Sequence, residues 1–166
     1  RRLCQAGVRF VEVQFGGWDM HNNIDNAMNT TGKSMDEVLA ALVTDLAATG
    51  LLESTLVVLA TEFGRSPVIV QAHKNGRDHH PTAFSCVLAG GGVNGGQVYG
   101  ETDSKGAQVT DGNVSIPDFN ATIGWALGLP IEDKFTASSG EQFQIANDGE
   151  PWPCEPNGVT IEYHDG

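Results

Sequence analysis

The stretch from Thr55 to Pro81 constrains the fold of this chain more than any other part of the sequence. It opens with an apolar run, Leu56 to Ala60, and then breaks abruptly into a polar loop with glycine and charged residues. A short apolar run of this kind is typical of a buried strand. In open α/β sheets, the loops at the carboxyl ends of the strands form the ligand sites. The sequence therefore predicts a strand that ends at a functional site.

A second strand and a helix are predicted before this run. Residues 8–15 are rich in Val and Phe and predict a strand, whereas the polar residues 24–31 predict a loop. The spacing of Ser34 and Glu37 is that of a capping box and predicts the start of a helix, which Gly50 would end. Strand, helix and strand together form a βαβ unit with parallel strands. The loops after both strands would then open on the same edge of the sheet.

Further elements are predicted downstream of the polar loop. Residues 83–89 are apolar and predict a third strand, and 97–100 with 108–110 predict a peripheral hairpin. Ser115 is placed to start another helix, which Gly128 would end. The sequence thus predicts an α/β fold with a mostly parallel sheet flanked by helices.

The length is that of a single domain, which we place at residues 1–145, with an extended tail at 146–166. The first residues read as the end of a helix with Gly7 as its C-cap, so we expect the chain to be the C-terminal part of a longer protein. A net charge of -12 argues against nucleic acid and anionic membranes as partners. No apolar run approaches the roughly 20 residues that a membrane span needs. The sequence leaves the oligomeric state open.

Metal-binding residue types lie in the predicted loops. Asp19 and His21 are two apart, so both can point to one centre, and this pair suits zinc, manganese or iron. Glu62 follows the apolar run after Thr61, and it is a candidate metal ligand, a catalytic carboxylate or a surface residue at a strand end. His79 and His80 are adjacent and point opposite ways in an extended segment, so at most one reaches a given metal. The other would contact substrate or solvent.

Anion-binding residues accompany them. Arg65 and Arg77 carry the guanidinium fork that grips phosphate or sulfate, and the alternative for both is a salt bridge to a nearby acid. Asp78 is placed to orient a ligating histidine. We expect Asn22 to contact substrate with the two arginines and His80.

Four sequence blocks resemble the domain-of-unknown-function family 1501 (DUF1501) over roughly residues 1–145. They are Gly16–Asn23, Thr61–Pro67, Gly76–Pro81 and Leu88–Gly96. Members of this family are secreted bacterial proteins, many with twin-arginine signals, related to sulfatases and alkaline phosphatases. The resemblance implies an alkaline-phosphatase/sulfatase-like fold, and a periplasmic or extracellular location.

The resemblance also implies ligand roles. One metal would take Asp19, His21 and the later His79. Glu62 stands where a second metal would have its aspartate, but Phe63 stands where that metal would have its histidine. A second metal is therefore not expected from these motifs.

The function implied is a metal-dependent hydrolase acting on sulfate or phosphate esters, of small molecules or polysaccharides. Metal would be held by Asp19, His21, Glu62 and His79, and it would be zinc, with manganese or calcium as alternatives. Arg65 would steady the anion as a catalytic residue. The nucleophile would lie upstream of Arg1, so this chain alone would not turn over an ester. The alternative is a non-catalytic, metal- or anion-binding secreted domain that retains the fold.

Overall fold

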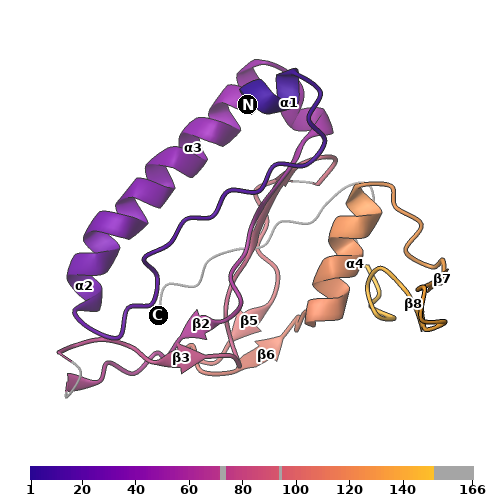
Figure 1. Ribbon diagram of the computed structural model, residues 1–166. Coiled ribbons are helices and arrows are strands. Elements are labelled where there is room, and N and C mark those ends of the chain that lie inside the picture. The colour runs from indigo at the N-terminus through magenta and orange to yellow at the C-terminus, as the bar shows by residue number, and fades with distance from the viewer. Residues whose placement is uncertain (72–73, 94, 152–166) are drawn as a thin grey trace.

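The computed structural model describes residues 1–71, 74–93 and 95–151. Most of the predicted tail, 152–166, lies outside the described residues. The helical elements in chain order (Figure 1) are α1 (Arg2–Gln5), α2 (Ile24–Ala27), a π-helical segment (Met28–Gly32), α3 (Lys33–Ala48), a 3₁₀ turn (Leu51–Ser54) and α4 (Ile116–Ala126). The strands are β1 (Leu56–Leu59), β2 (Gly64–Arg65), β3 (His79–His80), β4 (Val87–Gly90), β5 (Glu101–Thr102), β6 (Val109–Asp111), β7 (Phe135–Thr136) and β8 (Gln142–Phe143).

The described strands form separate antiparallel pairs, β1 with β4, β2 with β3, β5 with β6 and β7 with β8. The predicted mostly parallel, alkaline-phosphatase/sulfatase-like sheet flanked by helices is therefore wrong, and the described residues form a small mixed α/β domain. The β1 strand matches the apolar run, but its partner is the third apolar run, with Leu56 opposite Gly90 and Leu59 opposite Val87. Apolar composition predicted β1 and only the end of the third run as β4, since residues 83–86 are not strand, and it could not predict the direction of pairing.

The N-terminal run, residues 8–17, is extended but belongs to no described strand. It spans the length of α3, because Arg1 pairs with Asp45 near one end of that helix and Gly17 approaches Thr31 near the other (Figure 1). Its large apolar side chains are exposed, namely Val8, Phe10, Val11, Val13 and Phe15. The β-branched and aromatic signal of a strand is present, but a strand forms only where a neighbour supplies hydrogen bonds.

A nearly continuous helical segment runs from residue 24 to 48, so the predicted loop and the predicted capping box are both wrong. Ser34 lies inside α3 rather than at its start. The polar residues before it still form helix, and within it the Thr30 hydroxyl donates to carbonyls three and four residues earlier, at 3.1 and 3.0 Å. Gly50 follows the helix end in a left-handed conformation, as predicted.

The second half of the chain follows the prediction more closely. Ser115 caps α4, its hydroxyl accepts a hydrogen bond from the Asp118 backbone N–H, and the Asp118 carboxylate accepts one from the Ser115 backbone. The Ser115 hydroxyl also donates to the Asp118 carboxylate at 2.6 Å, and this bond first, followed by one from the Glu150 backbone N–H, lowers the pKa of Asp118. Gly128 follows the helix in the left-handed region. A peripheral hairpin is formed by β5 and β6, but its first strand follows the predicted residues 97–100, which are not strand.

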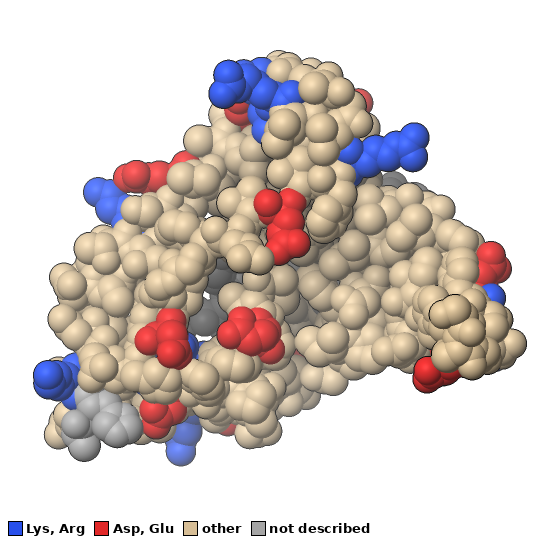
Figure 2. All heavy atoms as spheres, viewed as in Figure 1, with Lys and Arg blue, Asp and Glu red and all other residues tan. Residues whose placement is uncertain are grey.

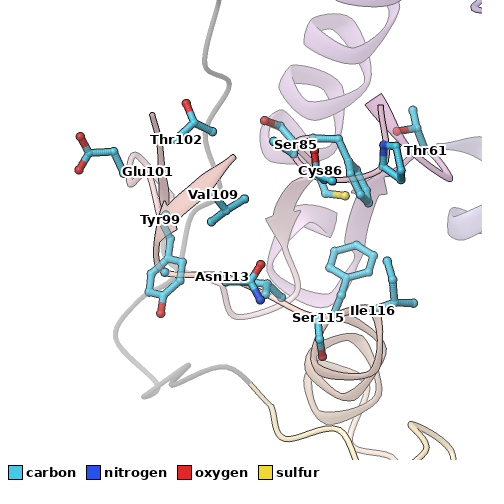
Figure 3. Close-up of a pocket in the computed structure, with 18 residues that line it drawn as sticks. Thr61, Ser85, Cys86, Tyr99, Glu101, Thr102, Val109, Asn113, Ser115 and Ile116 are labelled. Atoms are coloured by element: carbon cyan, nitrogen blue, oxygen red, sulfur yellow. The ribbon is translucent and has the colours of Figure 1, made fainter. Parts of the chain in front are cut away.

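A cavity of about 300 Å³ opens between the segment before β4, the β5–β6 hairpin and the start of α4 (Figure 3). Phe84, Val109 and Phe119 give it apolar walls, with Ser85 among its polar groups. Cys86 also lines it, and burial raises the pKa of this thiol.

Charged side chains of both signs are spread over the face shown in Figure 2. On the face in Figure 2, Lys and Arg side chains lie in small separate groups, and acidic side chains lie beside a central hollow. Among the described helices, none is both long and apolar enough to cross a membrane, as predicted.

Candidate metal centre

The short β2–β3 pair places Arg65 directly opposite His79 and Gly64 opposite His80. Gly64 is required here, because a Cβ atom would lie 2.8 Å from both the Ala83 carbonyl oxygen and the Phe84 Cβ. The close approach lets the loop after β1 lie against the segment that carries the two histidines. A guanidinium and an imidazole are thereby brought to the same face of a two-stranded ribbon.

A second backbone contact fixes His21. The Arg77 N–H donates to the Met20 carbonyl at 3.1 Å, and the Ile24 N–H donates to the Asn75 carbonyl at 3.0 Å. Met20 and Ile24 are both buried, so the residues around His21 are anchored on each side. Gly76 makes the approach possible, since a Cβ there would lie 1.8 Å from the His21 carbonyl oxygen.

The structure brings Asp19, His21 and His79 together, with one ligand atom of each lying within 4.8 Å of the others. The Asp19 Oδ1 atom is 3.0 Å from His21 Nε2 and 2.9 Å from His79 Nε2. The two Nε2 atoms are 3.1 Å apart. Three potential ligand atoms, at nearly equal distances from one another, thus face one point near the surface.

Asp78 determines which nitrogen of His21 faces that point. Its Oδ1 atom lies 3.1 Å from His21 Nδ1. An ionised carboxylate only accepts hydrogen bonds, so His21 Nδ1 must donate, and the Nε2 of the neutral ring then carries a free lone pair. A carboxylate behind a histidine in this way is the usual support of a metal-ligating imidazole.

Phe63 holds the other imidazole. Its ring centroid lies 4.3 Å from that of His79, with 33° between the planes, and the His21 ring lies 4.9 Å from His79 on centroids. Phe63 is therefore in contact with the cluster but brings no ligand atom. It packs against the histidine that the sequence predicted as a ligand.

Arg65 is the charged neighbour of the three donors. Its Nη2 donates to Asp19 Oδ1, its Nη1 donates to the Arg77 carbonyl at 3.0 Å, and Nη1 also lies 3.4 Å from His21 Nε2. The Arg65 side chain is 19% exposed, against 73% for Asp19. Hydrogen bonds from Arg65 and then His79 lower the pKa of Asp19 to about 2. The carboxylate is therefore ionised over the physiological range.

The donor set fits a divalent transition metal. Two imidazole nitrogens and one carboxylate oxygen are common zinc ligands, with bonds of about 2.0–2.2 Å. Ligands on a tetrahedron with such bonds are about 3.3 Å apart, close to the 2.9–3.1 Å found between Asp19, His21 and His79. Nitrogen donors and a low ligand count suit zinc better than calcium, which prefers six or more oxygens. Arg65 already supplies positive charge beside these atoms, and a divalent cation would supply more.

The remaining predicted residues lie outside this triad. Glu62 is exposed and is not one of the three residues with converging ligand atoms. His80 turns the other way, with Nε2 2.9 Å from both the Ala107 carbonyl and the Thr82 hydroxyl. Arg77 contributes backbone groups to both Met20 and Arg65. Asn22 is exposed and bridges to Asn75. Their predicted roles with metal or substrate stay predictions.

The sequence did not predict the contacts of Gly76 and Phe63, which position candidate ligands without supplying a ligand atom. A glycine after Asn75 is typical of a tight turn, but this pattern does not predict that Gly76 contacts His21. Phe63 was noted only as the absence of a histidine. Its stacking on His79 depends on the β2–β3 pairing, which the sequence did not predict.

Residues 1–152 match the family described as "Protein of unknown function (DUF1501)", and the chain belongs to this family. No curated protein matches the chain, nor does any solved structure.

Proposed function

We propose that this DUF1501 chain holds one divalent metal ion, zinc in the first instance, and uses it with Arg65 to bind an anionic sulfate or phosphate ester for hydrolysis. The observation that carries the proposal is the convergence of the Asp19, His21 and His79 ligand atoms. Manganese is the next candidate, since it shares imidazole and carboxylate ligands.

When bound, the metal would polarise an ester oxygen as a Lewis acid. The protein's own residues have separate tasks. Asp78 keeps the Nε2 lone pair of His21 aimed at the cluster, and Phe63 holds the His79 ring. Arg65 supplies two donor nitrogens next to the ligands, where they can bind the tetrahedral anion. The cluster itself provides binding and polarisation, and a covalent nucleophile would come from elsewhere in the protein.

Charge supports an anionic substrate. With neutral imidazoles, the charges of Asp19, Asp78 and Arg65 leave one net negative charge, so a divalent cation would make the centre positive. A positive centre on a chain with net charge -12 selects an anion locally, against the field of the whole protein. The ester class and the location remain expectations from the sequence motifs, and we propose on that basis a sulfate or phosphate ester of a small molecule or polysaccharide outside the cytoplasm.

A second function is favoured by one observation. Phe63, which stacks on His79, occupies the position where a second metal would need a histidine. A centre with one metal and no nucleophile of its own also suits a binding domain. The alternative is therefore a secreted domain that binds a metal or an anion and does not cleave esters.

Metal analysis tests the site. Wild-type protein loaded with zinc and passed over a desalting column should retain one zinc ion per chain, and His79→Ala should lose it. His80→Ala is the matched control, because this imidazole contacts Ala107 and Thr82 instead of the cluster, and it should retain zinc. Equal zinc in all three proteins, or none in the wild type, would refute the proposed centre.

Activity separates the two functions. Zinc-loaded protein that includes any preceding segment of the natural chain should hydrolyse an aryl sulfate or an aryl phosphate, and the preferred substrate identifies the ester class. Stoichiometric zinc with no hydrolysis of either ester, by protein that includes any preceding segment of the natural chain, would favour the binding domain.

A further inference from the structure

The Arg65 guanidinium contacts two of the three proposed ligand atoms. Its Nη2 donates to Asp19 Oδ1, and its Nη1 lies 3.4 Å from His21 Nε2. The positive group that now balances the converging lone pairs is therefore a side chain of the protein itself. The Arg65 side chain is also less exposed than those of the three proposed ligands, at 19% against 39% for His21, which is the least exposed of the three.

We propose that Arg65 competes with the divalent cation for Asp19 and His21, and that metal binding releases its guanidinium to bind the oxyanion of the substrate. Metal and anion would then bind cooperatively. This inference rests on the proposed metal centre and adds to it the order of events: the anion-binding group becomes available only when the metal is in place.

The competition follows from the number of lone pairs. His21 Nδ1 donates to Asp78, so the neutral ring has one lone pair left, on Nε2. That lone pair can face the Arg65 N–H or a metal, but not both. Two cations beside one carboxylate also repel each other, and the partly buried position of Arg65 weakens the screening by water.

The released group would stay close to the metal. Arg65 Nη1 donates to the Arg77 carbonyl at 3.0 Å, and its backbone is paired with His79. Neither contact involves a metal ligand atom of the cluster. Only the end of the side chain has to turn, and the guanidinium fork then has donors free for the oxygens of a sulfate or phosphate group.

Linkage makes the proposal quantitative. If zinc raises the affinity for an anion by some factor, the anion must raise the affinity for zinc by the same factor. A variant without the guanidinium loses the competitor and the anion group together. Arg65→Gln should therefore bind zinc more tightly and lose most of the coupling to the anion.

The experiment is calorimetric titration of zinc into the wild type, Arg65→Gln and Arg65→Lys, each without and with saturating inorganic sulfate. In a separate arm, phosphate replaces sulfate at concentrations that keep zinc phosphate soluble. Without anion, we expect Arg65→Gln to bind zinc about tenfold more tightly than the wild type. With sulfate or phosphate, the wild type should gain about tenfold and Arg65→Gln less than threefold. These are order-of-magnitude expectations for one coupled charged contact. Arg1→Gln, which removes a surface arginine paired with Asp45, should match the wild type in every arm.

A second readout follows the arginine directly. The ¹⁵N side-chain resonances of Arg65 should shift on adding zinc and shift again on adding sulfate. Arg65→Lys keeps the charge without the fork, so it should compete with zinc but show weaker coupling.

Zinc affinity in Arg65→Gln equal to or weaker than that of the wild type would overturn the competition, as would zinc and anion affinities that are independent in the wild type. The failure of the metal centre is distinguishable, because then the wild type binds no zinc in any arm.

Discussion

Asp78→Ala tests whether the carboxylate behind His21 supports a metal ligand. Removing the Asp78 carboxylate leaves His21 Nδ1 without its acceptor at 3.1 Å, so the ring can turn and its proton can move to Nε2, the proposed ligand atom. Losing such a supporting carboxylate typically weakens metal binding by about 10- to 100-fold, or about 1.4–2.7 kcal/mol.

Exposure decides where in this range the effect should fall. The side chains of Asp78 and His21 are 49% and 39% exposed, so water can replace part of the lost hydrogen bond. We therefore expect zinc affinity to fall by about tenfold in Asp78→Ala, near the lower limit for a supporting carboxylate. Asp78→Asn, which keeps a carbonyl acceptor but loses the charge, should lose less.

The assay is competition for zinc with a chromophoric chelator of known affinity, at neutral pH and fixed salt. Glu37→Ala is the matched control, since it also removes one carboxylate, from an exposed pair with Lys33 on α3. Circular dichroism establishes that each variant is folded. Zinc affinity in folded Asp78→Ala within twofold of the wild type would refute the argument that Asp78 sets the ligating nitrogen of His21.

Three further outcomes are expected. Gly76→Ala, whose Cβ would lie 1.8 Å from the His21 carbonyl, should lower both the melting temperature and zinc retention, and unchanged values of both would contradict the docking described for this segment. The lowered pKa of Asp19 means that its contact with Arg65 contributes to stability at pH values above the ordinary 3.8 and is lost as the pH falls toward about 2. A carboxyl ¹³C titration should show this midpoint near 2 and a higher midpoint in Arg65→Gln, whereas a wild-type midpoint at 3.8 would count against the contact. Ser115→Ala should destabilise the protein by about 1 kcal/mol in urea unfolding, because it removes the helix cap, and an unchanged midpoint would show that α4 does not depend on it.

The proximity of the candidate ligands was more predictable than the fold, for a physical reason. Candidate metal ligands are recognised by residue type, so Asp19, His21 and His79 could be chosen without knowing how the strands pair, and the structure brings their ligand atoms together. The adjacency of the two histidines gave further information, because extended backbone turns successive side chains to opposite faces. His79 does face the cluster, and His80 does face the hairpin.

The parallel sheet failed because strand direction depends on partners that a single run does not specify. Residues 8–15 carry a strong strand signal but have no ladder within the described part of the chain, and Leu56–Leu59 pairs with β4 instead. The capping box at Ser34 failed because helix already precedes it. At Ser115, where no helix precedes the cap, the predicted helix start was correct, and Gly128 follows the helix end.

The two-residue strand β3 contacts two different parts of the molecule. One end of the His79–His80 dipeptide touches the cluster, and the other is tied through the Ala107 carbonyl to the hairpin that borders the cavity in Figure 3. His79 and His80 are consecutive residues, so the backbone that carries the proposed metal ligand His79 also carries the contact with the border of the cavity.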